Sequence, residues 1–115
     1  MSTISEIRLL FEGALLITKD DEVDMVIPEY VVGNLKNIKV LGNLIIARLI
    51  DDYTSIQVSI SKDTYKGTHE TFAVPFEEIK EITENSLVTV TGEVYQTRTN
   101  EVTIRVFDLH RTIGV

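Results

Sequence analysis

The run from Ile38 to Ile50, IKVLGNLIIARLI, is the longest strand-like stretch of the chain and carries Gly42 in its middle. Branched aliphatic residues favour β-strands, and a glycine inside a long strand is typical of a bulge or a sharp bend. We therefore expect one long strand over residues 38–50 that bends at Gly42. Such a bend lets the two halves of one strand pair with different neighbours, which a small closed barrel requires of its first strand.

Two shorter strand patterns come next along the chain. The tight turn at residues 51–54 leads into Ile56–Ile60, where apolar and polar residues alternate with the period of two that is typical of a half-buried strand. After a polar loop, a third strand is expected over residues 68–74, with Phe72 and Val74 on one face.

A short helix and a final pair of strands complete the pattern. Pro75 is a favourable first residue for a helix, and acidic residues follow it where the helix dipole favours them. The apolar residues of this helix share one side: Phe76, Ile79 and Ile82. The last two strands are expected over Leu87–Gln96 and Glu101–Leu109, and a turn at residues 97–100 joins them.

The N-terminal 35 residues precede this pattern and are expected to form a β-hairpin and a connector. Every second residue over 7–17 is apolar or glycine, which predicts a strand, and Val23–Ile27 predicts a return strand that ends before Pro28. A helix is the competing interpretation of the first segment, because Thr3 and Glu6 fit a capping box. On that helix one face would hold Ile4, Ile7, Phe11 and Leu15.

From Ile38 onward the expected order is strand, strand, strand, short helix, strand, strand. This is the order of a five-stranded Greek-key barrel, the OB fold, and the helix between the third and fourth strands can close one end of it. The sequence therefore predicts an all-β protein with one short helix: an OB-fold barrel over residues 36–115, preceded by an N-terminal β-hairpin and connector over residues 1–35. At 115 residues, the chain has the size of one domain.

Three segments resemble a known family. Leu35–Leu44 (LKNIKVLGNL) is similar to the first strand of the small and middle subunits of replication protein A and of their telomeric CST relatives. Leu87–Tyr95 (LVTVTGEVY) and Val102–Leu109 (VTIRVFDL) are similar to the last two strands of these proteins. Anticodon-binding domains of tRNA synthetases and polymerase accessory subunits share this pattern. The resemblance implies an OB-fold accessory subunit of a DNA replication, repair or telomere complex that contacts single-stranded nucleic acid weakly.

The net charge of −7 at pH 7 is unevenly distributed along the chain. Residues 1–30 carry −5 and residues 67–85 carry −4, whereas residues 36–66 carry +2 and residues 86–115 balance at zero. A negative field repels phosphates at long range. The mildly basic middle segment nevertheless permits nucleic-acid binding on one face.

Several classes of function find no support in the sequence. The chain has no cysteine, which excludes disulfides, thiolate catalysis and cysteine-based zinc sites. Asp20–Asp24 fails the calcium-loop pattern, because Met25 stands where a glycine is needed. His69 and His110 belong to no catalytic motif, and no uncharged run is long enough to span a membrane. We expect no enzymatic activity, metal, cofactor or membrane association, and an intracellular protein, cytoplasmic or nuclear.

Proteins that bind single strands combine aromatic rings for base stacking with cations along the path of the backbone. In an OB fold these residues belong to strands two and three, to the loop after strand one and to the loop between strands four and five. The candidates in this sequence are Tyr53, Lys62, Tyr65, Lys66, His69, Phe72, Tyr95, Arg98 and Arg105. Two of them have a structural alternative, because Phe72 fits the core and Tyr95 fits packing across the last strand pair.

Two functions are open on this basis. In the first, the barrel is an accessory subunit that contacts single-stranded nucleic acid directly. In the second, it is an OB-fold scaffold that binds another protein subunit and no nucleic acid, which the acidic net charge and the aromatic content of 7% favour. The N-terminal hairpin is a candidate for covering a barrel edge or for a homodimer contact.

Overall fold

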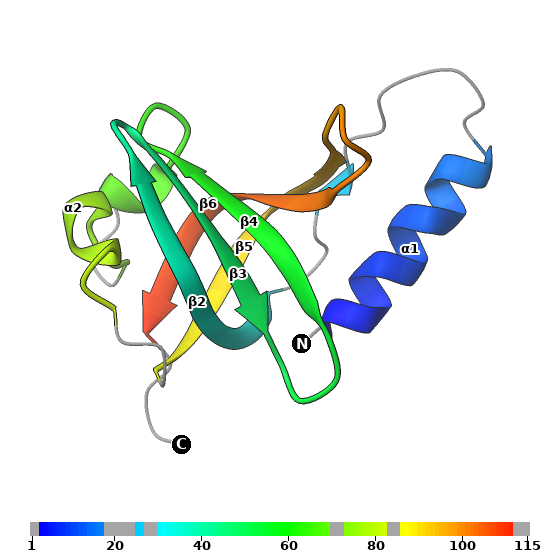
Figure 1. Ribbon diagram of the computed structural model, residues 1–115, viewed down its shortest axis with the longest axis horizontal. Coiled ribbons are helices and arrows are strands. Elements are labelled where there is room, and N and C mark those ends of the chain that lie inside the picture. The colour runs from blue at the N-terminus through cyan, green and yellow to red at the C-terminus, as the bar shows by residue number, and fades with distance from the viewer. Residues whose placement is uncertain (1–2, 18–24, 27–29, 70–72, 83–85, 112–115) are drawn as a thin grey trace.

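Five strands close into a barrel in the computed structural model, which describes residues 3–17, 25–26, 30–69, 73–82 and 86–111 (Figure 1). The barrel strands are β2 (Val31–Leu41), β3 (Leu44–Ile50), β4 (Ser55–Ser61), β5 (Leu87–Gln96) and β6 (Val102–Arg111). Their order is β5–β2–β3–β4–β6, and β5 also pairs with β6, which closes the ring. Strands β4 and β6 run parallel, and the other neighbours run antiparallel. The predicted five-stranded Greek-key barrel is confirmed.

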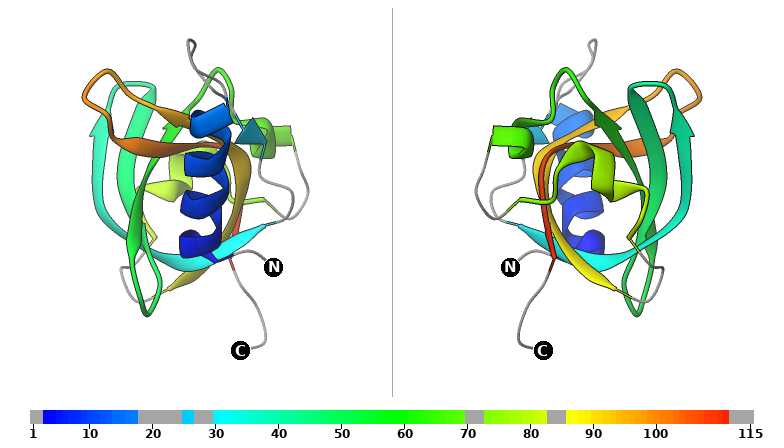
Figure 2. Two further views of the ribbon diagram at one scale, coloured as in Figure 1. Left: turned by 90° about the vertical axis from the view of Figure 1, so that its right-hand side faces the viewer. Right: turned by 90° about the vertical axis from the view of Figure 1, so that its left-hand side faces the viewer.

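The barrel is filled by alternate side chains of its strands and closed by a short helix. In β3, for example, the inward residues are at most 2% exposed, and the residues between them are partly exposed. Helix α2 (Phe76–Ile79) lies across one end of the barrel (Figure 2). The predicted plug is confirmed, since three apolar side chains are buried at this end: Phe76, Ile79 and Ile82.

The single long strand predicted over residues 38–50 is wrong, because the chain forms a hairpin there. Strand β2 ends at Leu41 and β3 begins at Leu44. Gly42 lies in the turn between them and has a φ of 64°, in the left-handed region that glycine adopts without strain. The glycine therefore reverses the chain instead of bending one strand.

The bend within the first barrel strand lies at Asn37 instead. Its φ is 55°, and the register between β2 and β3 shifts between Lys36 and Lys39. Asparagine tolerates the left-handed region better than most residues, so it can hold a bulge of this kind. Since β2 starts at Val31, the barrel begins before the predicted boundary at residue 36.

The strand predicted over residues 68–74 is also wrong. Lys66–His69 form a 3₁₀ turn, η1, and residues 70–72 lie outside the described part of the chain. Val74 is buried, and its amide donates a hydrogen bond to the Leu109 carbonyl over 2.8 Å. Because the hairpin at Gly42 already supplies the second barrel strand, β4 is the third, and the segment after it connects β4 to α2.

The N-terminal segment is a helix and not the first strand of the predicted hairpin. Helix α1 (Ile4–Ile17) starts after Thr3, whose Oγ1 accepts a hydrogen bond from the Glu6 amide over 3.1 Å. Among residues 4–12, whose burial the structure describes, Ile4, Ile7 and Phe11 are fully buried. Leu9, which a strand would place on the same face as Ile7 and Phe11, is 68% exposed. The buried face of α1 covers the end of the barrel opposite α2 (Figure 2).

The predicted return strand does not pair with the first segment. Within it the structure describes β1 (Met25–Val26), which pairs with Val94 and Glu93 of β5 and so extends the barrel sheet. The polar turn predicted at residues 19–22 lies outside the described residues. In the described part of the chain, no helix has the length and apolar character needed to cross a membrane.

Candidate nucleic-acid interface

One row of side chains runs around the outside of the barrel from β2 through β3, β4 and β6 to β5. The strand registers align its members pairwise: Lys36, Arg48, Gln57, Thr103 and Tyr95. Four of them are partly exposed, and Thr103 is buried beneath Gln57, whose Nε2 donates to the Thr103 Oγ1 over 3.2 Å. Neighbouring strands lie about 4.8 Å apart, so this cross-strand row extends about 19 Å along the curved surface.

At the β5 end of the row, an arginine and a tyrosine lie against each other. The guanidinium carbon of Arg105 is 4.5 Å from the centroid of the Tyr95 ring, and Arg105 also forms an ion pair with Glu93. The Tyr95 hydroxyl reaches β4, where it lies 3.2 Å from the Ser59 Oγ. These contacts fix both side chains, so the surface presents a pre-organised cation and an aromatic ring.

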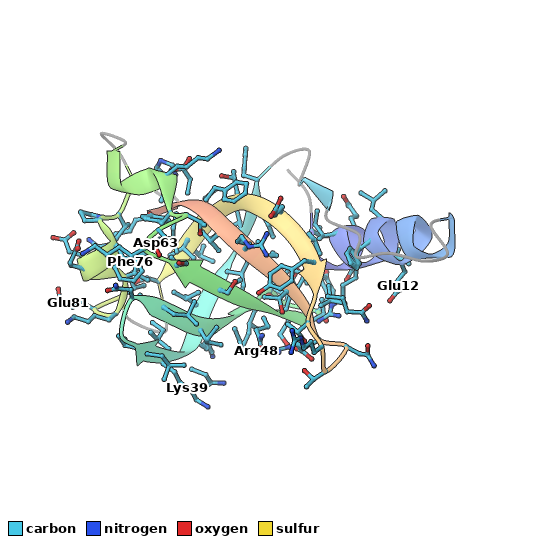
Figure 3. The ribbon with its side chains drawn as sticks, turned by 90° about the horizontal axis from the view of Figure 1, so that it is seen from above. Glu12, Lys39, Arg48, Asp63, Phe76 and Glu81 are labelled. Atoms are coloured by element: carbon cyan, nitrogen blue, oxygen red, sulfur yellow. The ribbon has the colours of Figure 1, made fainter. Side chains whose placement is uncertain are left out.

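Arg48, in the middle of the face, is held by two partners. Its Nη1 lies 2.5 Å from the Glu101 Oε1, and its Nη2 donates to the Ser55 Oγ over 2.9 Å. Figure 3 shows Arg48 beside the turn that joins β5 to β6, which supplies Glu101. Both arginines of the face are therefore paired with a carboxylate, and the pairs are partly exposed.

A second cation lies over an aromatic ring nearer to α2. The Nζ of Lys66 is 4.8 Å from the centroid of the Phe107 ring, and Phe107 follows Arg105 on β6 with one residue between them. Lys62 is engaged elsewhere, because its Nζ lies 3.2 Å from the Glu77 Oε1. The pKa of Glu77 is lowered by a hydrogen bond from the Glu77 backbone amide and by the nearby Lys62 ammonium.

The structure brings together only some of the residues predicted for the site. Tyr95 and Arg105 are in contact, Arg98 is exposed in the adjoining turn, and Lys66 of η1 lies over Phe107 of β6, the strand that also carries Arg105. Tyr53 is 88% exposed, but it lies in the loop between β3 and β4 and lines a pocket over β2. The backbone of His69 is in η1, and nothing more of it is described.

Phe72, a candidate for base stacking, lies outside the described residues. The acidic run Asp20–Asp24, for which the sequence predicts no metal, also lies outside them. Among the residues that the structure does describe, no group of three or more histidine or carboxylate side chains lies close enough to hold a metal ion.

The prediction for Tyr65 is wrong, because this side chain belongs to the core. It is 3% exposed and offers no ring face to a base. Its hydroxyl donates to the Val74 carbonyl over 2.6 Å and accepts from the Leu109 amide over 3.2 Å. Tyr65 thus ties the segment before α2 to β6, and a substitution here tests stability and not binding.

We expect the stability of the protein to fall between pH 10 and pH 12 because of Tyr65. Burial raises the pKa of this hydroxyl to about 12, so the unfolded chain releases the proton first as pH rises. The free energy of unfolding should therefore be unaffected by Tyr65 below pH 10 and lose about 2–3 kcal/mol by pH 12. Urea titrations across this range measure the loss.

The matched variant is Tyr65→Phe, which cannot ionise. It should be about 1–2 kcal/mol less stable than the wild type at pH 8, because the Val74 carbonyl loses its donor. That difference should shrink as the pH approaches 12. A constant difference at all pH values would contradict the burial of the hydroxyl.

The sequence prediction missed Arg48, Gln57 and Phe107. The predicted single strand over residues 38–50 contains Arg48 and is strand one, which lies outside the expected binding strands two and three. A signal for its position was present, since Gly42-Asn43 between two strand-like runs is a known hairpin dipeptide. A turn at this point would have made β3 and β4 the second and third strands and put Arg48 on the binding face.

The comparisons with known proteins agree with this architecture. A family model described as an OB-fold nucleic acid binding domain matches residues 30–111. The match starts one residue before β2 and ends at the last residue of β6, so it covers the whole barrel. The search of curated proteins gave no match. Because the matched segment makes up most of the chain, this protein belongs to the family of OB-fold nucleic acid binding domains.

Proposed function

We propose that this protein is a non-enzymatic accessory subunit that binds single-stranded nucleic acid along the cross-strand row, from β5 through β6, β4 and β3 to β2. The observation that carries the proposal is the cross-strand row, in which two cations, two hydrogen-bonding side chains and a tyrosine are aligned by strand register. A single strand laid along this row would find cations for its phosphates and the Arg105–Tyr95 pair for a base.

The binding should be weak on its own, for two electrostatic reasons. The net charge of −7 repels a polyanion, and Arg48 and Arg105 are each paired with a carboxylate. A weak contact of this kind becomes useful when another subunit holds the domain close to the strand, since tethering multiplies affinity. The resemblance to subunits of replication protein A and CST supports a DNA replication, repair or telomere complex inside the cell.

Fluorescence anisotropy with a labelled single-stranded oligonucleotide tests the proposal. If Lys36, Arg48 and Arg105 each neutralise a phosphate, affinity should fall about 20-fold between 50 and 200 mM salt. Arg48→Gln should weaken binding and make the slope of log affinity against log salt shallower by about 0.7. The matched control is Lys80→Gln, an exposed lysine after α2, which changes the net charge equally and should leave the slope unchanged.

The second candidate function, a protein-binding scaffold, is favoured by one observation. Leu9 and Leu10 are adjacent on α1 and are 68% and 51% exposed, so they place two neighbouring large apolar side chains on the surface. The anisotropy titration separates the two functions. A flat signal up to about 100 μM protein at low salt would remove the direct contact, because nonspecific binding alone is detectable in that range.

A further inference from the structure

A pocket of about 430 Å³ opens over the outer face of β2, next to the loop that joins β3 and β4. This loop projects at the bottom of Figure 1, close to the start of α1. The volume lies within the range of small-molecule sites. The pocket shares Lys36 with the cross-strand row, but it contains none of the residues of β4 or β6, so it is a second feature of the surface.

The pocket has apolar walls and an aromatic rim. Val32, Ile50 and Leu87 line it from three neighbouring strands, and the Tyr53 ring, 88% exposed, stands at its edge. Side chains of this kind suit a flat ring with two apolar faces. Nucleobases have such faces, and stacking on a tyrosine is tolerant of base identity.

Asn34 lies between Ile50 and Leu87 in the strand register and also lines the pocket. Its Oδ1 is buried and accepts no hydrogen bond from any described residue. An unpaired buried acceptor is costly, and no hydrogen bond from a described residue fixes this oxygen. A rotation about χ2 would turn the amide, with its donor and its acceptor, toward the edge of a base.

The charges of the pocket are separated. Lys36 supplies a cation on the side that adjoins Arg48, and Asp51 and Asp52 supply carboxylates from the loop. One carboxylate oxygen of Asp51 is already engaged, because its Oδ1 accepts hydrogen bonds from the amides of Tyr53 and Thr54 over 2.8 and 2.9 Å. Asp52 is exposed. This arrangement favours a ligand with an anion at one end and hydroxyl donors at the other.

We propose that the pocket binds a nucleotide with a 5′-phosphate near Lys36, its base against Tyr53 and its free ribose hydroxyls toward Asp52. Carboxylates accept hydrogen bonds from ribose hydroxyls in other nucleotide sites. A phosphate on the 3′ side would meet the two aspartates and be repelled. The ligand is therefore a free mononucleotide or the 3′-terminal nucleotide of a strand, and the second case rests on the function proposed above.

Two isomers of adenosine monophosphate test the site directly. Titration of the ¹⁵N-labelled protein with 5′-AMP should shift the amide signals of Asn34 and Tyr53 in a saturable way. With 3′-AMP the affinity should be about tenfold lower, because its phosphate would lie beside like charges. Equal affinity for the two isomers, or no shift of these signals at 10 mM nucleotide, would overturn the proposal.

Variants with small structural effects sharpen this test. Asp52→Asn should raise the affinity for 3′-AMP and bring the ratio between the isomers close to one. Asp63→Asn, an exposed aspartate at the end of the barrel that carries α2 (Figure 3), changes the net charge equally and should leave the ratio unchanged. Tyr53→Ala should weaken both isomers at least about fivefold.

Oligonucleotides separate the two sources of the ligand. If the pocket holds the end of a strand, an RNA 10-mer with a 3′-hydroxyl should bind several-fold tighter than the same RNA with a 3′-phosphate, and Asp52→Asn should remove the difference. If the two RNAs bind equally while 5′-AMP is preferred over 3′-AMP, the ligand is a free mononucleotide. If 5′-AMP binds and no RNA or DNA strand does, the result supports the nucleotide pocket and contradicts the proposed strand-binding function.

Discussion

Gly92→Ala is expected to lower the free energy of unfolding by about 3 kcal/mol or more, the largest effect of an alanine substitution among Gly33, Gly42, Gly67 and Gly92. A Cβ at this position would lie 1.9 Å from the Arg105 carbonyl oxygen and 2.9 Å from its carbonyl carbon. Both are backbone atoms of the paired strand, so rotation of a side chain cannot relieve the clash. The register between β5 and β6 also shifts between Thr91 and Gly92.

The matched control is Gly42→Ala in the hairpin turn. No atom lies within 4 Å of a Cβ built there, so only the left-handed backbone conformation opposes the change. The expected loss is about 1 kcal/mol. Urea denaturation of both variants measures the difference. If Gly92→Ala unfolds at the same urea concentration as Gly42→Ala, the two strands do not approach as closely as described.

The last two strands and α2 could be predicted because each is specified by its own residues. From Val88 to Val94 every second residue is valine or glycine and the residues between them are polar, and the structure gives the predicted strand Leu87–Gln96 the same bounds. Pro75 fixes the start of α2, and only one side of that helix is apolar. In these segments the local sequence pattern and the position in the barrel agree, so the pattern is sufficient to predict the element.

Two segments were mispredicted because their pattern fits two structures equally well. In Ile38–Ile50, Gly42 satisfies a bent strand and a hairpin turn alike, and only pairing with the rest of the barrel decides between them. In α1, Ile7 and Phe11 fit both a strand with Leu9 and a helix with Ile4. The capping pattern of Thr3 and Glu6 favours the helix locally. The burial of Ile4 and the exposure of Leu9 depend on the open end of the barrel that α1 covers.

The residue types of the candidate site could be predicted from the sequence, but the contacts that these residues make could not. Tyr95 and Arg105 were found because aromatic and cationic residues flanked the last hairpin. The ion pair of Arg48 with Glu101 joins residues 53 positions apart, and the burial of Tyr65 depends on Leu109, 44 positions away. These contacts determine which cation is free and which ring is accessible, and they arise only when the barrel closes.

Removing the two acids that pair with the arginines should strengthen binding to single strands. In the variant Glu93→Gln/Glu101→Gln, both guanidinium groups would face the phosphates without a competing carboxylate. We expect affinity for a single-stranded oligonucleotide to rise about tenfold at 50 mM salt. The slope of log affinity against log salt should stay close to the wild-type value, because Arg48 and Arg105 already neutralise phosphates in the wild type and the variant adds no cation. Anisotropy titrations at several salt concentrations measure both quantities.

A general change of net charge must be separated from this local effect. Glu78→Gln/Glu81→Gln removes two exposed acids near α2, where Figure 3 shows Glu81 far from Arg48. It changes the net charge by the same amount and should raise affinity only slightly. Equal gains in the two double variants would mean that the arginines of the face do not contact the strand.

The loss of Arg105 should cancel the gain from Glu93→Gln, and this dependence distinguishes binding from stability. Glu93 is expected to act on the ligand only by competing for the guanidinium of Arg105, with which it is paired. In the wild-type background, Glu93→Gln raises the affinity for the oligonucleotide. In the Arg105→Gln background, it should raise this affinity only as much as the change of net charge does. A partly exposed pair of this kind contributes at most about 1 kcal/mol to folding. All four proteins of this cycle should therefore remain folded, and a gain that persists without Arg105 would place the contact with the strand elsewhere on the surface.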